Sequence, residues 1–155
     1  MNKTKVEAMI KRSSLIVMII AAVEAFFALF LVIMEYIELK SGKRMPDTFY
    51  NNIMPEVVEM LFNGIVYLVE MIIFFRIFRS GRPFTNGNII AVRVIAALSF
   101  IGSIVRALLV YRSGLPITSA LFGSVFSVFG AVIFLFFAEI MRYGKLLQIE
   151  SDETL

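Results

Sequence analysis

The sequence predicts an all-α integral membrane protein, with four transmembrane helices packed as an antiparallel bundle. Of its 155 residues, 59% are hydrophobic and 17% are charged, whereas soluble domains usually carry about 25% charged residues. Four apolar runs each hold at least 20 residues, which suffices to cross a hydrocarbon core of about 30 Å at a rise of about 1.5 Å per residue. The short connections between the runs indicate that consecutive helices are antiparallel.

The first apolar run covers residues 15–37 and follows a positively charged segment that contains Lys11 and Arg12. A secretory signal peptide has a similar pattern, but its apolar region is only about 7–15 residues long. Here the apolar run continues through FFALFLVIM to Met34. We therefore interpret this segment as an uncleaved transmembrane helix.

Three further spans are expected, at residues 53–78, 89–110 and 117–141. The connection before the third span contains Pro83, which cannot continue the helix that precedes it. Thr85 is a suitable N-cap for the third span, because a threonine hydroxyl can accept a hydrogen bond from the first helical turn. The chain is thus predicted to be one membrane domain, residues 1–155, with a short cytoplasmic tail at residues 142–155.

Basic residues are distributed unequally between the two sides of the membrane in this topology. Nine Lys and Arg residues fall on the side of the termini and of the connection at residues 79–88, and four fall on the opposite side. Short loops rich in basic residues remain in the cytoplasm. Both termini of this multi-pass protein are therefore predicted to be cytoplasmic.

The residue types that are missing from the sequence exclude several kinds of chemistry. Without Cys or His, the chain lacks thiol catalysis, disulfides and the usual zinc ligands. Its Asp residues, Asp47 and Asp152, are predicted on opposite sides of the bilayer, so they cannot form a catalytic pair. We expect no enzymatic activity, no metal and no cofactor. The basic residues lie at the ends of apolar runs, which suits a lipid bilayer rather than direct binding to nucleic acid.

One ionisable residue from each span is predicted on the inner half of the bilayer. A lone charge at the centre of a transmembrane helix costs about 2.5–3.5 kcal/mol, so such residues are expected to face the bundle and to pair. We expect Arg93 to pair with Glu70, with Glu24 or Glu139 as a third member. This intramembrane ionic cluster consists of Glu24, Glu70, Arg93 and Glu139.

A second polar cluster is predicted nearer the outer face. Glu59 and Glu70 are 11 residues apart, which at about 100° per residue places them within about 20° on one helix face, and Asn63 shares that face. The outer cluster consists of Glu35, Glu59, Asn63 and Arg106. Two interpretations stay open: the charges fix helix register, or they form a site for a ligand, an ion or a proton.

Small residues recur along one side of the fourth span, at Ser119, Gly123, Ser127 and Gly130. Small residues at this spacing let helix backbones approach closely. We interpret this face as packing within the bundle, with homodimerisation as the alternative.

Two cytoplasmic segments offer candidate partner-binding surfaces, the loop RSGRPFTNGN and the tail RYGKLLQIESDETL. The tail is either a solvated continuation of the fourth helix or a docking segment for a cytosolic partner. The candidate contact residues are Arg82, Pro83, Phe84, Thr85, Asn88, Leu146, Leu147, Glu150 and Asp152.

Two segments resemble a known family. GRPFTNGNIIAVRVIA resembles the central PF-T/S-x-x-N signature of the bacterial four-helix membrane proteins classed as domain of unknown function 2975, and FFAEIMRYGKLLQIESDETL is similar to the closing pattern of that family. The matching positions are Pro83, Phe84, Thr85, Asn88, Glu150, Asp152, Thr154 and Leu155. Asn86 and Gly87 stand where the family often has charged residues before the Asn.

The resemblance implies an uncharacterised multi-pass protein of the bacterial cytoplasmic (inner) membrane, with cytoplasmic termini and no enzymatic activity. Members of the family look similar to proteins encoded beside small DNA-binding regulators. We therefore expect a membrane protein that binds and restrains a cytosolic DNA-binding transcriptional regulator. The alternative is a small transporter, channel or toxin-immunity protein that uses an intramembrane Glu/Arg site.

Overall fold

The computed structural model describes residues 3–42, 53–114 and 117–153, and these residues form four long helices. The helices are α1 (Lys3–Lys40), α3 (Met54–Ser80), α4 (Asn86–Arg112) and α5 (Ile117–Glu153). Each contains a segment long enough and apolar enough to cross a membrane. The prediction of an all-α chain with four such helices is confirmed.

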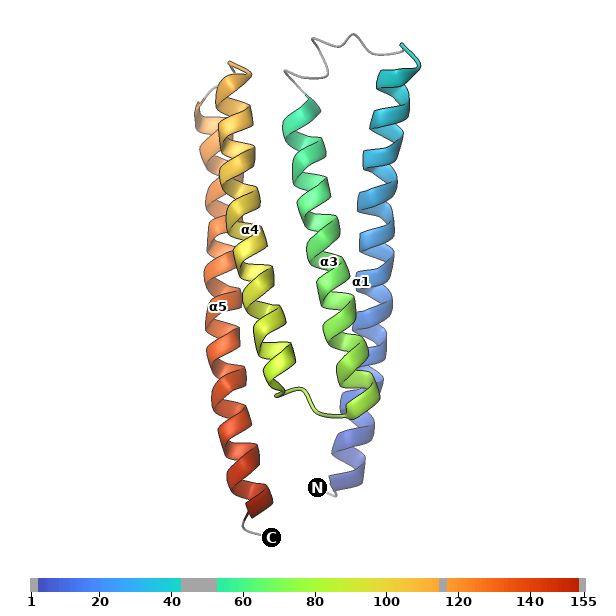
Figure 1. The fold of residues 1–155 in the computed structure, drawn as a ribbon, viewed down its shortest axis with the longest axis vertical. Coiled ribbons are helices and arrows are strands. Elements are labelled where there is room, and N and C mark those ends of the chain that lie inside the picture. The colour runs from blue at the N-terminus through green and yellow to red at the C-terminus, as the bar shows by residue number, and fades with distance from the viewer. Residues whose placement is uncertain (1–2, 43–52, 115–116, 154–155) are drawn as a thin grey trace.

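Consecutive helices provide most of the packing. α1 packs on α3, and α5 packs on α4, whereas the seam between α3 and α4 is less extensive. In Figure 1 the helices stand in the order α1, α3, α4, α5, and both ends of the chain lie at the same end as the α3–α4 loop. The molecule therefore consists of two helical hairpins, α1–α3 and α4–α5, that meet along α3 and α4.

Two of the helices extend well beyond the apolar runs predicted from the sequence. α1 begins at Lys3, before the run that starts at Leu15, and α5 continues to Glu153, after the run that ends at Met141. Residues 142–153 of the predicted tail are thus a direct continuation of α5.

The large apolar side chains of these helices point outward. Phe26, Phe126 and Phe136 are 63%, 70% and 66% exposed, an exposure that water would penalise and that lipid tails accommodate. The main cluster of buried apolar residues is small and lies in the half of the bundle nearest the α3–α4 loop. It consists of Val66, Ile73, Ile77, Ile89, Val92, Ile95 and Ala138.

Glycines allow the closest approaches between helices. A Cβ atom at Gly102 of α4 would lie 2.9 Å from Cγ of Phe62 on α3. A Cβ atom at Gly64 of α3 would lie 3.1 Å from Leu29 of α1. The seam between the hairpins therefore depends on the missing side chain at Gly102.

We expect Gly102→Ala to destabilise the protein by about 1–3 kcal/mol, because the added methyl meets the base of the Phe62 side chain and forces α3 and α4 apart. Gly130→Ala is the matched control, since no neighbouring atom of the described residues lies within 4 Å of a Cβ there. Thermal unfolding in detergent measures both. Equal midpoints for the two variants would contradict the proposed role of Gly102.

Candidate functional site

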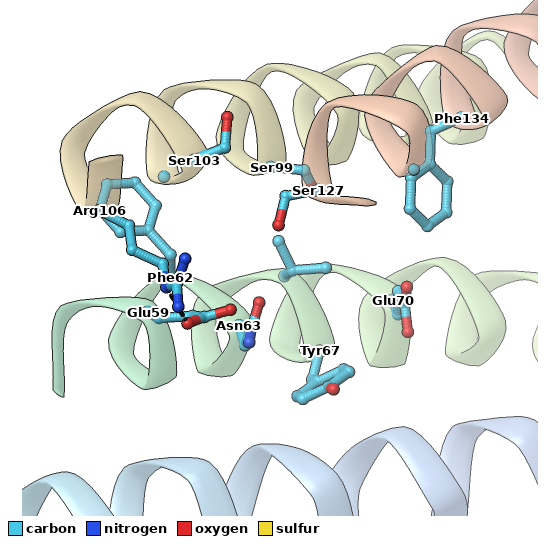
Figure 2. Close-up of a pocket in the computed structure, with 13 residues that line it drawn as sticks. Glu59, Phe62, Asn63, Tyr67, Glu70, Ser99, Ser103, Arg106, Ser127 and Phe134 are labelled. Carbon is cyan, nitrogen blue, oxygen red and sulfur yellow. Dashed lines mark ion pairs between the residues drawn. The ribbon is translucent and has the colours of Figure 1, made fainter. Parts of the chain in front are cut away.

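A polar cavity lies between α3, α4 and α5. Its volume is about 220 Å³, and Figure 2 shows acidic, amide and hydroxyl side chains around it. Its polar lining consists of Glu59, Asn63, Tyr67, Glu70, Ser99, Ser103, Arg106 and Ser127. A cavity with this lining is unusual among apolar helices, where polar residues often mark a functional site.

An ion pair between α3 and α4 lies at one end of the cavity. Arg106 Nε is 2.6 Å from Glu59 Oε2, with the two side chains 19% and 36% exposed. Arg106 Nη1 is buried and has no hydrogen-bond partner among the described residues. Asn63 lies beside this pair in Figure 2. The pair therefore joins α3 to α4 at this end of the cavity, with one guanidinium donor enclosed by the surrounding side chains.

Helix periodicity explains why these residues share the cavity. Glu59, Asn63 and Glu70 follow one face of α3, and Ser99, Ser103 and Arg106 follow one face of α4 at intervals of four and three residues. The structure thus brings together three members of the predicted outer cluster, Glu59, Asn63 and Arg106. The fourth, Glu35, is half-buried on α1 and is not among the residues that line the cavity.

The predicted intramembrane ionic cluster is divided between the two hairpins. Arg93 Nη2 pairs with Glu139 Oε1 at 2.5 Å, so the expected pair of Arg93 with Glu70 is wrong, and Glu139, expected as a possible third member, is the partner of Arg93. Glu70 lines the polar cavity, and Glu24 of α1 lies close enough to Glu70 for their charges to interact. Arg93 does not meet Glu70 because it points to a side of α4 that faces away from α3. Arg93 and Arg106 are 13 residues apart on α4, about 140° around the helix, so only Arg106 faces α3.

The expectation that Arg93 and Glu139 face the interior of the bundle is also wrong. Their side chains are 45% and 55% exposed on the outer surface of α4 and α5. Arg142, which is 66% exposed, lies 3.5 Å from the other oxygen of Glu139. The three residues form an outward-facing cluster close to the end of the bundle that holds both termini.

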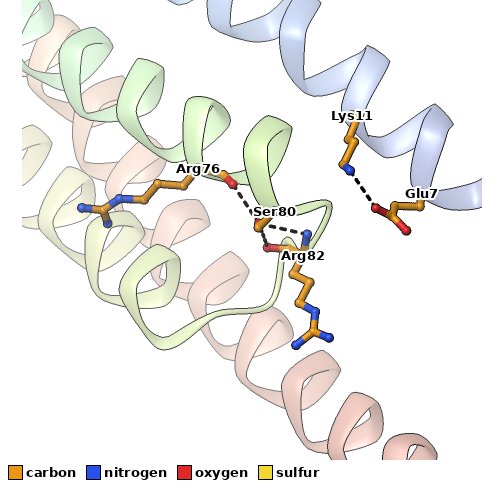
Figure 3. Close-up of polar contacts among 5 residues, drawn as sticks. All are labelled: Glu7, Lys11, Arg76, Ser80 and Arg82. Atoms are coloured by element: carbon orange, nitrogen blue, oxygen red, sulfur yellow. Dashed lines mark hydrogen bonds and ion pairs between the residues drawn. The ribbon is translucent and has the colours of Figure 1, made fainter.

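The α3–α4 loop begins with a tightly bonded helix end. Gly81 has a φ of 68°, and its N–H donates to Ile77 O at 2.7 Å. Ser80 Oγ donates to Arg76 O at 2.8 Å and accepts from Arg82 N at 3.1 Å, as Figure 3 shows. The left-handed backbone at Gly81 is the usual way to end a helix, and it turns the chain toward α4.

The second half of the loop is held by the start of α4 and by α5. Thr85 Oγ1 accepts from Asn88 N at 3.2 Å, as predicted for an N-cap. The fully buried Asn88 side chain donates to Pro83 O at 3.0 Å. The Phe84 ring packs on Gly144 of α5, where a Cβ would lie 3.1 Å from the ring. We call residues 81–88, with their contact to Gly144, the loop clasp.

The loop clasp changes the interpretation of the predicted partner-binding residues. Four of them, Pro83, Phe84, Thr85 and Asn88, make contacts within the protein. The residues that remain exposed are Arg82, Leu146, Leu147 and Glu150, and the side chain of Asp152 lies outside the described residues. The sequence analysis missed the bond from Lys145 Nζ to Asn86 Oδ1, 2.9 Å long, which also joins α5 to the loop.

The small residues of α5 do not all serve close packing. Ser127 and Gly130 line the polar cavity. The side chain of Ser119 and the surroundings of Gly123 are not among those that the structure describes. Ser124, on the same helix, donates to Ser103 O of α4 at 3.3 Å. The small side chains therefore leave space for the cavity and allow a polar contact between helices.

Comparisons with known proteins found no matching family model, no matching curated protein and no matching solved structure. The chain must be interpreted from its own geometry. Among the described residues, no group of three or more His, Cys, Asp and Glu side chains is placed to hold a metal ion.

We expect Asn88→Ala to lower the free energy of unfolding by about 1–3 kcal/mol, because it leaves Pro83 O without its donor in a buried loop. Thr4→Ala is the control, since Thr4 is exposed near the start of α1 and a surface substitution usually changes stability by less than about 0.5 kcal/mol. Thermal unfolding in detergent distinguishes them. If the two variants unfold at the same temperature, the loop clasp does not stabilise the fold.

Proposed function

We propose that this chain is a non-enzymatic, multi-pass protein of the bacterial inner membrane, whose cytoplasmic end binds and restrains a cytosolic DNA-binding regulator. The observation that carries the proposal is the continuation of α5 past its apolar run as residues 142–153. On this extension Leu147 and Ile149 are 47% and 42% exposed. Exposed apolar side chains beyond a membrane span provide a surface for a protein partner.

The proposed orientation, with both termini in the cytoplasm, is supported by charge. Both ends of the chain and the α3–α4 loop lie at one end of the bundle (Figure 1). That end carries most of the basic residues, including Arg12, Arg79 and Arg82. The positive-inside rule favours a cytoplasmic location for such an end.

A hollow between the two hairpins adjoins the α5 extension. It measures about 420 Å³ and lies between the start of α1 and the end of α5, with the end of α3 at its base. Val6 and Ile10 of α1 provide apolar walls, and Gln148 and Arg82 provide polar groups. Apolar walls with a few polar groups suit a turn or a short helix of a protein partner. The choice of a DNA-binding regulator rests on the family resemblance of the loop and the tail.

We expect a small DNA-binding protein to co-purify with the full-length chain from membranes of its native host. Leu147→Ser/Ile149→Ser should weaken binding of the purified regulator about tenfold or more, because two apolar contacts are lost. Tyr111→Ser is the control, since Tyr111 is exposed at the opposite end of α4. Fluorescence titration of purified regulator measures each affinity. Equal affinities for all three proteins, or no co-purifying regulator, would refute the proposal.

The polar cavity favours a second function, the movement of a proton or of a small polar solute through the bundle. This function requires charged and polar groups along a path within the membrane. Glu59, Arg106 and Glu70 line one continuous hollow, and Glu24 interacts electrostatically with Glu70. The Glu/Arg pair and the carboxylates would then be the site.

For this second function, we expect proton flux into proteoliposomes that contain the purified protein, and its loss in Glu70→Gln. Glu56→Gln is the matched control, because Glu56 lies on the same helix but is exposed and outside the cavity lining. A pH-sensitive dye inside the vesicles reports the flux, and an unchanged melting temperature shows that each variant is folded. Flux no higher than that of protein-free vesicles would exclude proton transport.

A further inference from the structure

The outward-facing cluster of Arg93, Glu139 and Arg142 borders a hollow between α4 and α5, which we call the α4–α5 groove. The hollow measures about 390 Å³ and lies between the first turns of α4 and the part of α5 that follows its apolar run. It is distinct from the polar cavity and from the hollow beside α1. Residues that line it include Asn86, Ile90, Arg93, Arg142, Lys145 and Leu146.

The charge around this groove is positive. Arg93 and Arg142 share one carboxylate, Glu139. Lys145 Nζ donates instead to a neutral group, Asn86 Oδ1, at 2.9 Å. Three cations thus have one anionic partner among the described residues of the groove. The guanidinium groups each have five N–H donors, so donors remain for an external anion.

The cations are spread along the helix axis over the depth of a membrane interface. Asn86 is opposite Lys145, and Arg93 is opposite Glu139. Glu139 and Lys145 are six residues apart, which corresponds to about 9 Å of helix. The headgroup region of each leaflet is about 5–7 Å thick. Arg142 and Lys145 can therefore lie among headgroups while Arg93 reaches up from the edge of the hydrocarbon core.

An exposed apolar stripe continues from the groove along α4. Ile90, Val94 and Ile101 are 60%, 43% and 49% exposed, and their spacing of four and seven residues places them on one face of the helix. Leu146 of α5, which is 52% exposed, borders the groove on the other side. A ligand that fills this groove and follows the stripe has an anionic head and apolar chains.

We infer that the α4–α5 groove binds the phosphate of an anionic phospholipid, whose acyl chains lie along Ile90 and Val94. Basic pockets between transmembrane helices recognise anionic headgroups in this way. A zwitterionic lipid would bring a cationic amine toward the arginines and would bind less well. Free phosphate has no apolar part to contact the stripe. The inference is independent of the regulator and of transport.

The test uses the purified full-length protein in detergent, titrated with phosphatidylglycerol or phosphatidylcholine and monitored by native mass spectrometry. We expect preferential binding of phosphatidylglycerol. Arg142→Gln/Lys145→Gln should weaken it about 25-fold, because each basic residue at headgroup level contributes about fivefold. Lys145→Gln alone should weaken it about fivefold. Arg142 is exposed and Lys145 is half-buried, and unchanged melting temperatures would show that the variants are folded.

The control is Lys5→Gln/Arg12→Gln, which removes the same charge from α1 at the same end of the bundle. We expect this control to bind phosphatidylglycerol as the unmodified protein does, and millimolar inorganic phosphate not to displace the lipid. An equal loss in the control would show general surface electrostatics and would overturn the inference. Displacement by inorganic phosphate, or undiminished binding by the double groove variant, would also overturn it.

Discussion

Hydrocarbon supplies no hydrogen bonds, so every ionisable side chain on these four helices must obtain its polar partners from the protein or from the membrane interface. The molecule meets this constraint in two ways. Glu59 and Arg106 pair across the seam between the hairpins, inside a cavity with further polar groups. Arg93 and Glu139 pair on the outer surface, with Arg142 beside them, close to the end of the bundle that holds both termini. The two arginines of α4 thus lie in different surroundings because they point to different sides of one helix.

Helix number and the polar face of α3 could be predicted from the sequence, because both depend on residues along a single element. Apolar length indicates a span, and the 11-residue interval between Glu59 and Glu70 places them on one face. The partner of Arg93 could not be predicted, because it depends on which helix lies beside α4 and on the rotation of both. Residue counts placed both Glu70 and Glu139 on the inner half of the bilayer, but this does not determine which of them faces an arginine.

The loop illustrates a second limit of sequence patterns. A run such as Pro83, Phe84 and Thr85 in a polar connection resembles an exposed binding motif, and only the N-cap role of Thr85 has a clear local signal. The burial of Asn88 and the contact of Phe84 with Gly144 involve a helix far along the chain. These internal contacts explain why a loop would need particular residue types without any partner. They also restrict a docking surface to side chains that stay exposed, chiefly on the α5 extension.

The two halves of the bundle differ in how firmly they are joined. Near the termini, the loop clasp and the core residues Ile77 and Ile89 hold α3, α4 and α5 together. In the other half, the same three helices surround the polar cavity, and Phe62 against Gly102 is a close contact across the seam. Coupling between distant sites travels through packed elements that both sites share. A molecule bound in the cavity could therefore influence the end of the bundle that holds both termini through α3, α4 and α5, and the α5 extension is the part of that path which reaches the proposed docking surface.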